Sequence, residues 1–270
     1  MVLEALGIDD DRMSVVVPDP LRADWDCLVA RTPAPAPFDP AMAEHLPAPA
    51  RRWLDHAIAP GTALCRRTRL TQRGRLRLNG RWRPMQAVQA LDPLAGFVWV
   101  VEVRLLGLPV RGFDRLVDGT EGWEGEMRHR LFGRFTVVHV EGPDYRRSAA
   151  ARAAAELMWA PAAALDPGVE WRSVDDARCT AVVPVAGHEH EVTLTVADDG
   201  ALRAITLPRW TQAEGGDDDS WGLRPFAGRI ERETTFGGFT VPSLTVAGYG
   251  DDWRQLLGAN GDHEHHHLRI

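Results

Sequence analysis

The chain has 270 residues, ten tryptophans and a formal net charge of −7 at pH 7. A chain of this length buries enough apolar surface to fold without disulfides or metals. The negative charge argues against nucleic acid as a partner, because binding to a phosphate backbone depends on clustered positive charge. All 31 side chains counted as Lys or Arg are arginines. Schiff-base catalysis, a P-loop and a kinase-type ATP site each need a lysine and are therefore excluded.

The N-terminal segment carries acids at residues 9–11, where a secretory signal peptide needs basic residues. The longest apolar run, around residues 97–101, is too short to cross a bilayer. The three cysteines, Cys27, Cys65 and Cys179, are far apart and lack the spacing of a zinc site. We therefore expect a cytoplasmic protein with reduced, partly buried cysteines and no membrane insertion.

The first 46 residues are predicted to form an N-terminal arm that contains a short helix over Leu21–Ala30 and a Pro/Ala-rich run. Residues 47–270 are predicted to form a single domain. It begins with a helix over Ala50–Ile58, because prolines precede this segment and Pro60 and Gly61 follow it.

From Leu64 onward the apolar period is two, which indicates strands with one buried face, and Gly-containing turns separate them. An Ala-rich helix over residues 148–159, with Ser148 as its N-cap and Pro161 after its end, interrupts the strands. A last strand is predicted at His263–Ile270. The expected fold is mainly β (α+β): a large curved antiparallel sheet or half-barrel of about 10–11 strands, with this central helix and the N-terminal helices.

Several short motifs follow one another in a fixed order: Gln89, Phe97, Trp99, Asp118-Gly119, Glu156-x-x-Trp159-x-Pro161 and Gly238-Phe239-x-Val241-Pro242. Over residues 46–270 this order resembles an uncharacterised bacterial domain family of unknown function. The resemblance implies a fold similar to the half-barrel of the bacterial lipoprotein carriers. It also implies the binding of a lipid-like or other apolar molecule.

Glu156 and Trp159 lie three residues apart on the predicted helix and so share a face. A carboxylate beside an indole favours a buried acid/base or a polar anchor. The alternative is that Trp159 belongs to the core and that Glu156 pairs with Arg152 or with an arginine of the sheet.

Aromatic side chains and one amide occur on neighbouring predicted strands, a combination typical of an apolar ligand site. The predicted ligand-binding residues are Trp82, Gln89, Trp99, Trp123 and Trp159. An ordinary core with a satisfied amide is the alternative.

His188 and His190 project from one face of a predicted strand, as do His265 and His267 of the C-terminal strand. Two such strands side by side could supply a metal site, and a polar strand end is the alternative. The preferred interpretation includes no metal and no other cofactor.

The preferred function is that of a binding protein, which holds an apolar or amphipathic small molecule between the concave sheet and the central helix in a cavity of roughly a few hundred Å³. The alternative is a cofactor-independent enzyme, such as a cyclase, isomerase or hydrolase, with Glu156 as its acid/base and His129 or Arg209 polarising the substrate. A third interpretation is an assembly module whose exposed sheet edges pair with a partner. The chain has neither a GxSxG nucleophile motif nor a GxGxxG dinucleotide motif.

Overall fold

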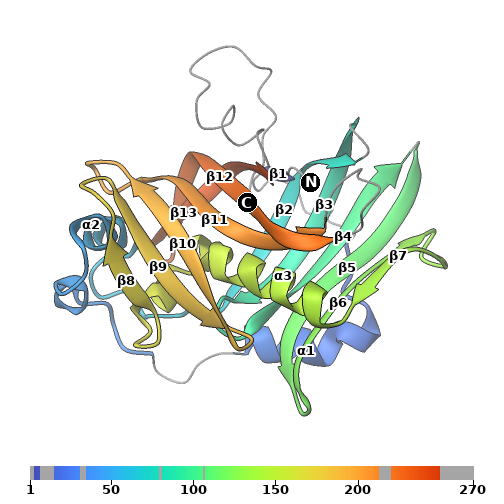
Figure 1. The fold of residues 1–270 in the computed structure, drawn as a ribbon, viewed down its shortest axis with the longest axis horizontal. Helices are drawn as coiled ribbons and strands as arrows, with labels where there is room; N and C mark the ends of the chain where they lie inside the picture. The colour runs from blue at the N-terminus through green and yellow to red at the C-terminus, as the bar shows by residue number, and fades with distance from the viewer. Residues whose placement is uncertain are drawn as a thin grey trace.

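The computed structural model describes residues 3–6, 15–30, 35–78, 81–105, 107–212 and 220–249. The described strands form one curved antiparallel sheet with the order β7-β6-β5-β4-β3-β2-β1-β13-β12-β11-β10-β9-β8 (Figure 1). It consists of two six-stranded meanders, β2–β7 and β8–β13, and β1 pairs with a strand of each. The mainly β fold with a curved antiparallel sheet is therefore confirmed.

The first half of the sheet contains β1 (Leu3–Leu6), β2 (Thr68–Leu78), β3 (Arg81–Asp92), β4 (Gly96–Leu105), β5 (Leu108–Gly119), β6 (Gly122–Leu131) and β7 (Phe135–Glu141). The second half contains β8 (Glu170–Ser173), β9 (Arg178–Val185), β10 (His188–Val196), β11 (Leu202–Gln212), β12 (Trp221–Phe236) and β13 (Phe239–Tyr249). The described residues thus contain 13 strands, more than predicted, because β1 and β7 lie where no strand was expected. The predicted strand His263–Ile270 lies outside the described residues.

The central helix, α3, runs from Pro143 to Ala155 and so begins five residues before the predicted start. Its N-cap is Gly142, with φ of +99°, and Pro143 occupies the first helical position, where its missing N–H leaves no hydrogen bond unmade. Ser148 is therefore not the N-cap. It lies inside the helix and is buried.

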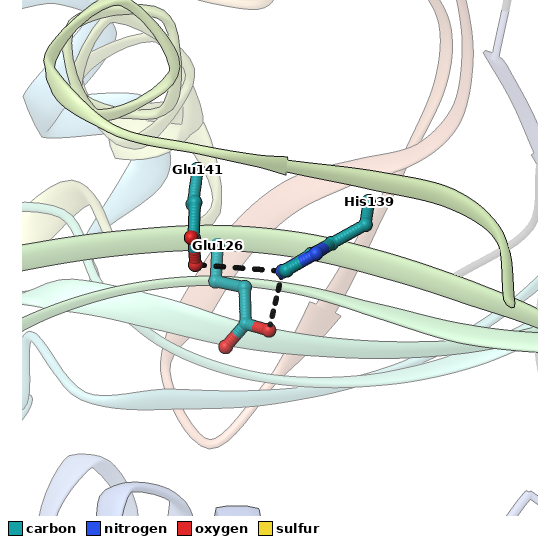
Figure 2. A group of neighbouring side chains, drawn as sticks. All are labelled: Glu126, His139 and Glu141. Carbon is teal, nitrogen blue, oxygen red and sulfur yellow. Dashed lines mark ion pairs between the residues drawn. The ribbon is translucent and has the colours of Figure 1, made fainter.

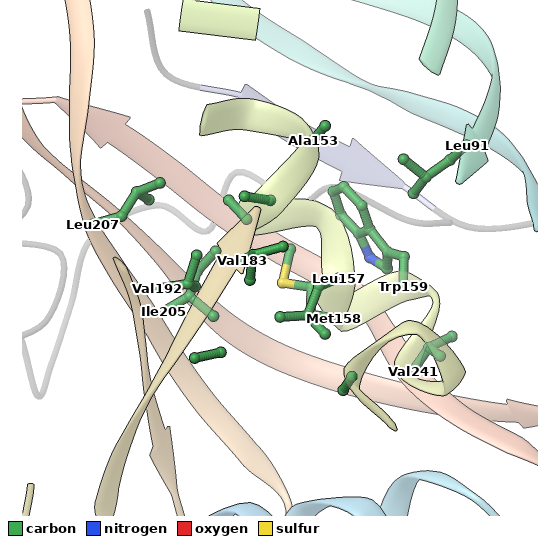
Figure 3. Packing of buried hydrophobic residues seen from close by; sticks show 14 of the residues in the cluster. Leu91, Ala153, Leu157, Met158, Trp159, Val183, Val192, Ile205, Leu207 and Val241 are labelled. Atoms are coloured by element: carbon green, nitrogen blue, oxygen red, sulfur yellow. The ribbon is translucent and has the colours of Figure 1, made fainter. Parts of the chain in front are cut away.

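α3 connects the two edge strands of the sheet, β7 and β8, across the concave face, and it contacts both meanders (Figure 1). Six of its alanines are buried, and their small side chains let the helix backbone lie close to the strands. A 3-10 turn, Glu156–Trp159, and a second one, Pro161–Leu165, follow α3. Figure 3 shows Leu157, Met158 and Trp159 among side chains of the second meander in the main core.

The N-terminal helices cover other surfaces. α1 (Arg22–Val29) and the 3-10 turn before it, Asp19–Leu21, pack on the outer face of β3 and β4, where a second apolar cluster is buried. The 3-10 turn Pro40–Ala43 leads to α2 (Ala48–Ala57), which contacts β9, β10 and β13. Among the described residues no helix combines the length and the apolar character that a membrane crossing requires.

Candidate functional site

Glu156 begins the 3-10 turn after α3 and is 6% exposed, and both of its carboxylate oxygens accept hydrogen bonds. Arg152, one helical turn earlier, donates from Nε to Oε1 over 2.8 Å. The side-chain amide of Gln89 donates to Oε2 from β3. The pairing with Arg152, one of the two interpretations of Glu156, is therefore present.

Arg152 binds a second carboxylate, because its NH1 group donates to Asp114 Oδ2 over 2.9 Å. Its guanidinium also lies 4.5 Å from the ring centre of Phe97 and 4.9 Å from that of Trp99. Burial by itself lowers the pKa of Arg152, but Glu156 and Asp114 outweigh burial and raise it. The arginine therefore stays charged inside the sheet, held by two acids and two aromatic faces.

These groups belong to a longer set of linked side chains. Gln72 donates to Gln89 Oε1 over 3.0 Å and accepts from Trp99 Nε1 over 2.8 Å, and both amides are fully buried. At the other end, His129 Nε2 lies 3.3 Å from Asp114 Oδ1. We call this set the buried polar chain; it consists of His129, Asp114, Arg152, Glu156, Gln89, Gln72 and Trp99. Its members satisfy one another, which fixes their positions.

A small, partly open pocket lies beside the buried polar chain, between the end of α3 and strands β11–β13. Four of the residues singled out in the sequence line it: Trp99, Glu156, Trp159 and Arg209. Most of the remaining wall is apolar, formed by side chains such as Met158, Ile205, Phe226 and Ala247. The structure therefore brings residues from β4, from the 3-10 turn after α3 and from β11 to one place.

The volume of this pocket is about 60 Å³, which is smaller than the few hundred Å³ expected for a ligand cavity between helix and sheet. The physical reason is the alanine-rich face of α3, which packs closely against the strands. A water needs roughly 10–15 Å³ on such a measure, so the pocket has room for a few water-sized groups.

Arg209 lines this pocket and has no acidic partner among the described residues. Its Nε donates weakly to the carbonyl of Ser148 at 3.4 Å, and its guanidinium lies 5.4 Å from the ring centre of Phe226 and 5.5 Å from that of Tyr249. Within the described part of the chain it forms no ion pair. Trp159, which also lines the pocket, donates from Nε1 to the carbonyl of Pro242 over 3.1 Å.

Two predicted ligand-binding residues lie elsewhere. Trp82 is seven positions from Gln89 on β3, and since side chains alternate along a strand, the two face opposite sides of the sheet. Trp123 packs at the margin of the main core, where its carbonyl accepts from Arg146. Neither lines the pocket.

Sequence reasoning missed Gln72 and Asp114. Both occupy inward positions of strands, next to Arg73 and Arg115, and a single polar residue at a buried position of an alternating pattern was the available signal. Their partners come from other strands, so the contacts depend on strand register.

The two histidines of β10 line a different pocket, of about 270 Å³, together with Arg147 and Trp210. His190 is buried, and its Nε2 has no hydrogen-bond partner among the described residues. Burial, with smaller effects from His188 and Arg147, lowers the pKa of His190 to about 4. The other two candidate ligands, His265 and His267, lie outside the described residues, so a joint metal site stays a prediction.

Figure 2 shows another histidine with two acids, Glu126 on β6 and His139 and Glu141 on β7, whose potential ligand atoms lie close together. His139 Nε2 is 3.3 Å from Glu126 and 3.4 Å from Glu141. Arg128 already occupies the space between them, 2.6 Å from Glu126 Oε1 and 3.2 Å from His139 Nε2. The same atoms therefore serve an arginine, and we assign no metal to this group.

Comparison with known families places this geometry in a wider context. The model of a family of unknown function, DUF6544, matches residues 36–257. The chain belongs to this family. The match starts ten residues before the start of the resemblance noted in the sequence and includes all the residues of the buried polar chain. No curated protein and no solved structure matches the chain.

Proposed function

We propose that this member of the DUF6544 family binds a small amphipathic molecule in the pocket between α3 and strands β11–β13. The carrying observation is Arg209, a cation with no acidic partner among the described residues, beside a mostly apolar wall. Such a wall with a few polar groups at one end suits a ligand that has an apolar part and an anionic end. The small volume suits a short ligand, or one end of a longer molecule.

The hydrogen bonds of Glu156 favour binding over acid/base catalysis. A general acid or base needs an oxygen free to reach the substrate, and both oxygens of Glu156 are engaged by Arg152 and Gln89. In this proposal Glu156 fixes the position of the residues that line the pocket and does not transfer a proton. The proposal also includes a fold like that of the lipoprotein carriers and a location in the cytoplasm.

The test uses two probes of the same shape, isovalerate and the uncharged isovaleramide, with binding followed by ligand-observed NMR. We expect the acid to bind at least tenfold more tightly than the amide. R209Q should remove that preference, while R203Q, on the same strand but outside the pocket and paired with Asp199, should keep it. Equal binding of acid and amide to the unmodified protein would overturn the proposal.

The enzyme alternative predicts a different result. Native mass spectrometry of the purified protein would identify a co-purifying molecule, which is then incubated with fresh protein. A binding protein returns it unchanged. An enzyme converts it, and E156Q should abolish the conversion if Glu156 is the acid/base.

A second candidate function is assembly, favoured by the edge strand β7. Phe135, Val137 and Val138 are 67%, 52% and 39% exposed on this edge, and an exposed apolar edge is a template for strand pairing. Light scattering after size exclusion would show a dimer that V137K converts to a monomer, whereas a monomer at all concentrations would reject assembly.

A further inference from the structure

A pocket of about 420 Å³ lies on the outer face of the sheet, between residues 15–21 and strands β4–β6. This volume falls within the range of small-molecule sites, roughly 300–1,000 Å³. None of the candidate site residues from the sequence lines it. Its apolar walls come from the segment before α1 and from the strands, and include Val16, Pro20, Leu21, Val100 and Phe113.

Strand register places a charge imbalance in this pocket. Glu102 on β4 is directly opposite Arg111 on β5, and Arg111 is directly opposite Arg130 on β6. Glu102 accepts from Arg111 Nε over 2.8 Å. Arg130 forms no ion pair with a described residue, and its shielded Nε has no hydrogen-bond partner there. Arg111 and Arg130 therefore face each other on adjacent strands, and the single acid of this row, Glu102, lies on the far side of Arg111. Two like charges directly opposite each other are unfavourable without a counter-charge.

The neighbouring arginines of the pocket are already paired. Arg128 lies 2.6 Å from Glu126, and Arg115 donates to Asp24 over 2.8 Å and to Glu124 over 2.9 Å. The excess positive charge thus lies in the row that contains Arg111 and Arg130. A bound anion would supply the counter-charge that this row lacks, although the formal net charge of the chain is −7.

We propose that this outer pocket binds a single-chain amphipathic anion. A carboxylate or phosphate head would lie between Arg130 and Arg111, since guanidinium groups bind both anions in bidentate fashion. The apolar chain would lie along Val100, Phe113 and Leu21. The site is separate from the concave pocket, on the other face of the sheet, so either proposal can fail alone.

The experiment compares decanoate with 1-decanol and butyrate by isothermal titration. The protein should bind one equivalent of decanoate at this pocket, and R130Q should weaken the affinity for that equivalent at least tenfold. The matched control is R104Q, an exposed arginine on the same face of β4 and outside the pocket, and it should bind as the unmodified protein does. R209Q should also leave this equivalent unchanged, because Arg209 belongs to the concave pocket.

Two further measurements keep the proposal falsifiable. E102Q frees Arg111 for the ligand and should tighten decanoate binding. R130Q removes a like-charge contact, so without ligand it should melt no lower than the unmodified protein. Equal effects of R130Q and R104Q, or equal binding of decanol and decanoate, would overturn the proposal. So would binding to vesicles of anionic phospholipid without binding of free decanoate, which would assign the arginines to a membrane headgroup.

Discussion

Arg152 and Glu156 form an ion pair one helical turn apart, with Nε and Oε1 separated by 2.8 Å, inside the curve of the sheet. Burying two charges is costly unless their remaining hydrogen-bonding groups are also satisfied. Asp114, Gln89 and the faces of Phe97 and Trp99 satisfy them here. The pair therefore fixes the end of α3 against β3–β5, and with it one wall of the concave pocket.

Replacing Arg152 by Met should destabilise the protein strongly. It would leave Glu156 and Asp114 as buried acids without their cation, and breaking a buried pair in this way costs about 3–5 kcal/mol. Urea denaturation would measure the loss. Arg203→Met, which removes an exposed pair with Asp199, should cost less than about 1 kcal/mol. A loss of similar size in both variants would contradict a structural role for the buried pair.

The three cysteines should differ in reactivity. Cys27 and Cys65 are exposed rather than partly buried as the sequence suggested, whereas Cys179 is buried, and burial raises the pKa of its thiol to about 12. The thiolate is the reactive form, so a thiol reagent should label two cysteines in the native protein and the third only after unfolding. Mass spectrometry would count the labels. Fast native labelling of Cys179 would show that β9 opens readily.

Local patterns predicted much of the fold, because alternation and turn residues act over short distances. The helix near Ala50–Ile58 and most strands were found in this way. The start of α3 was placed at Ser148, although Gly142 and Pro143 carried a start signal of their own. β1 was missed since a four-residue strand has little pattern, and its place between β2 and β13 depends on contacts distant in sequence.

The candidate site was predicted in part for the same reason. Glu156, Trp159 and Trp99 stood out by spacing and alternation and do line one pocket. Trp82 was grouped with Gln89 although an odd separation along a strand places them on opposite faces. The pairing of Arg111 with Arg130 follows from the register of β5 and β6, a non-local property that no short motif encodes.

Gly238 should tolerate no side chain. Its φ is +87°, and a Cβ there would come within 2.1 Å of Thr62 Oγ1. Its neighbour Gly237 has φ of +57°, and a Cβ there would meet open space. Gly237→Ala therefore tests backbone strain alone, without crowding. We expect Gly237→Ala to cost about 1 kcal/mol and Gly238→Ala about 1–3 kcal/mol more, measured by urea denaturation. Adding Thr62→Ala to Gly238→Ala should recover part of the loss, and no recovery would argue against crowding as its cause.

His190 should make the protein less stable in mild acid. Its pKa is lowered from 6.5 to about 4, mainly by burial and to a smaller extent by its neighbours His188 and Arg147. Between these values the unfolded chain binds a proton that the native protein does not, so stability falls as the pH drops from about 6.5 towards 4. The full effect on the free energy of unfolding is up to about 3 kcal/mol.

Urea denaturation from pH 7.5 to 4.5 should therefore show a shallower decline in stability for H190Q than for the unmodified protein. H139Q, which replaces an exposed histidine on β7, should keep the original decline. Parallel curves for the unmodified protein and H190Q would mean that His190 takes up its proton in the folded state, and that the pocket beside it admits water to Nε2.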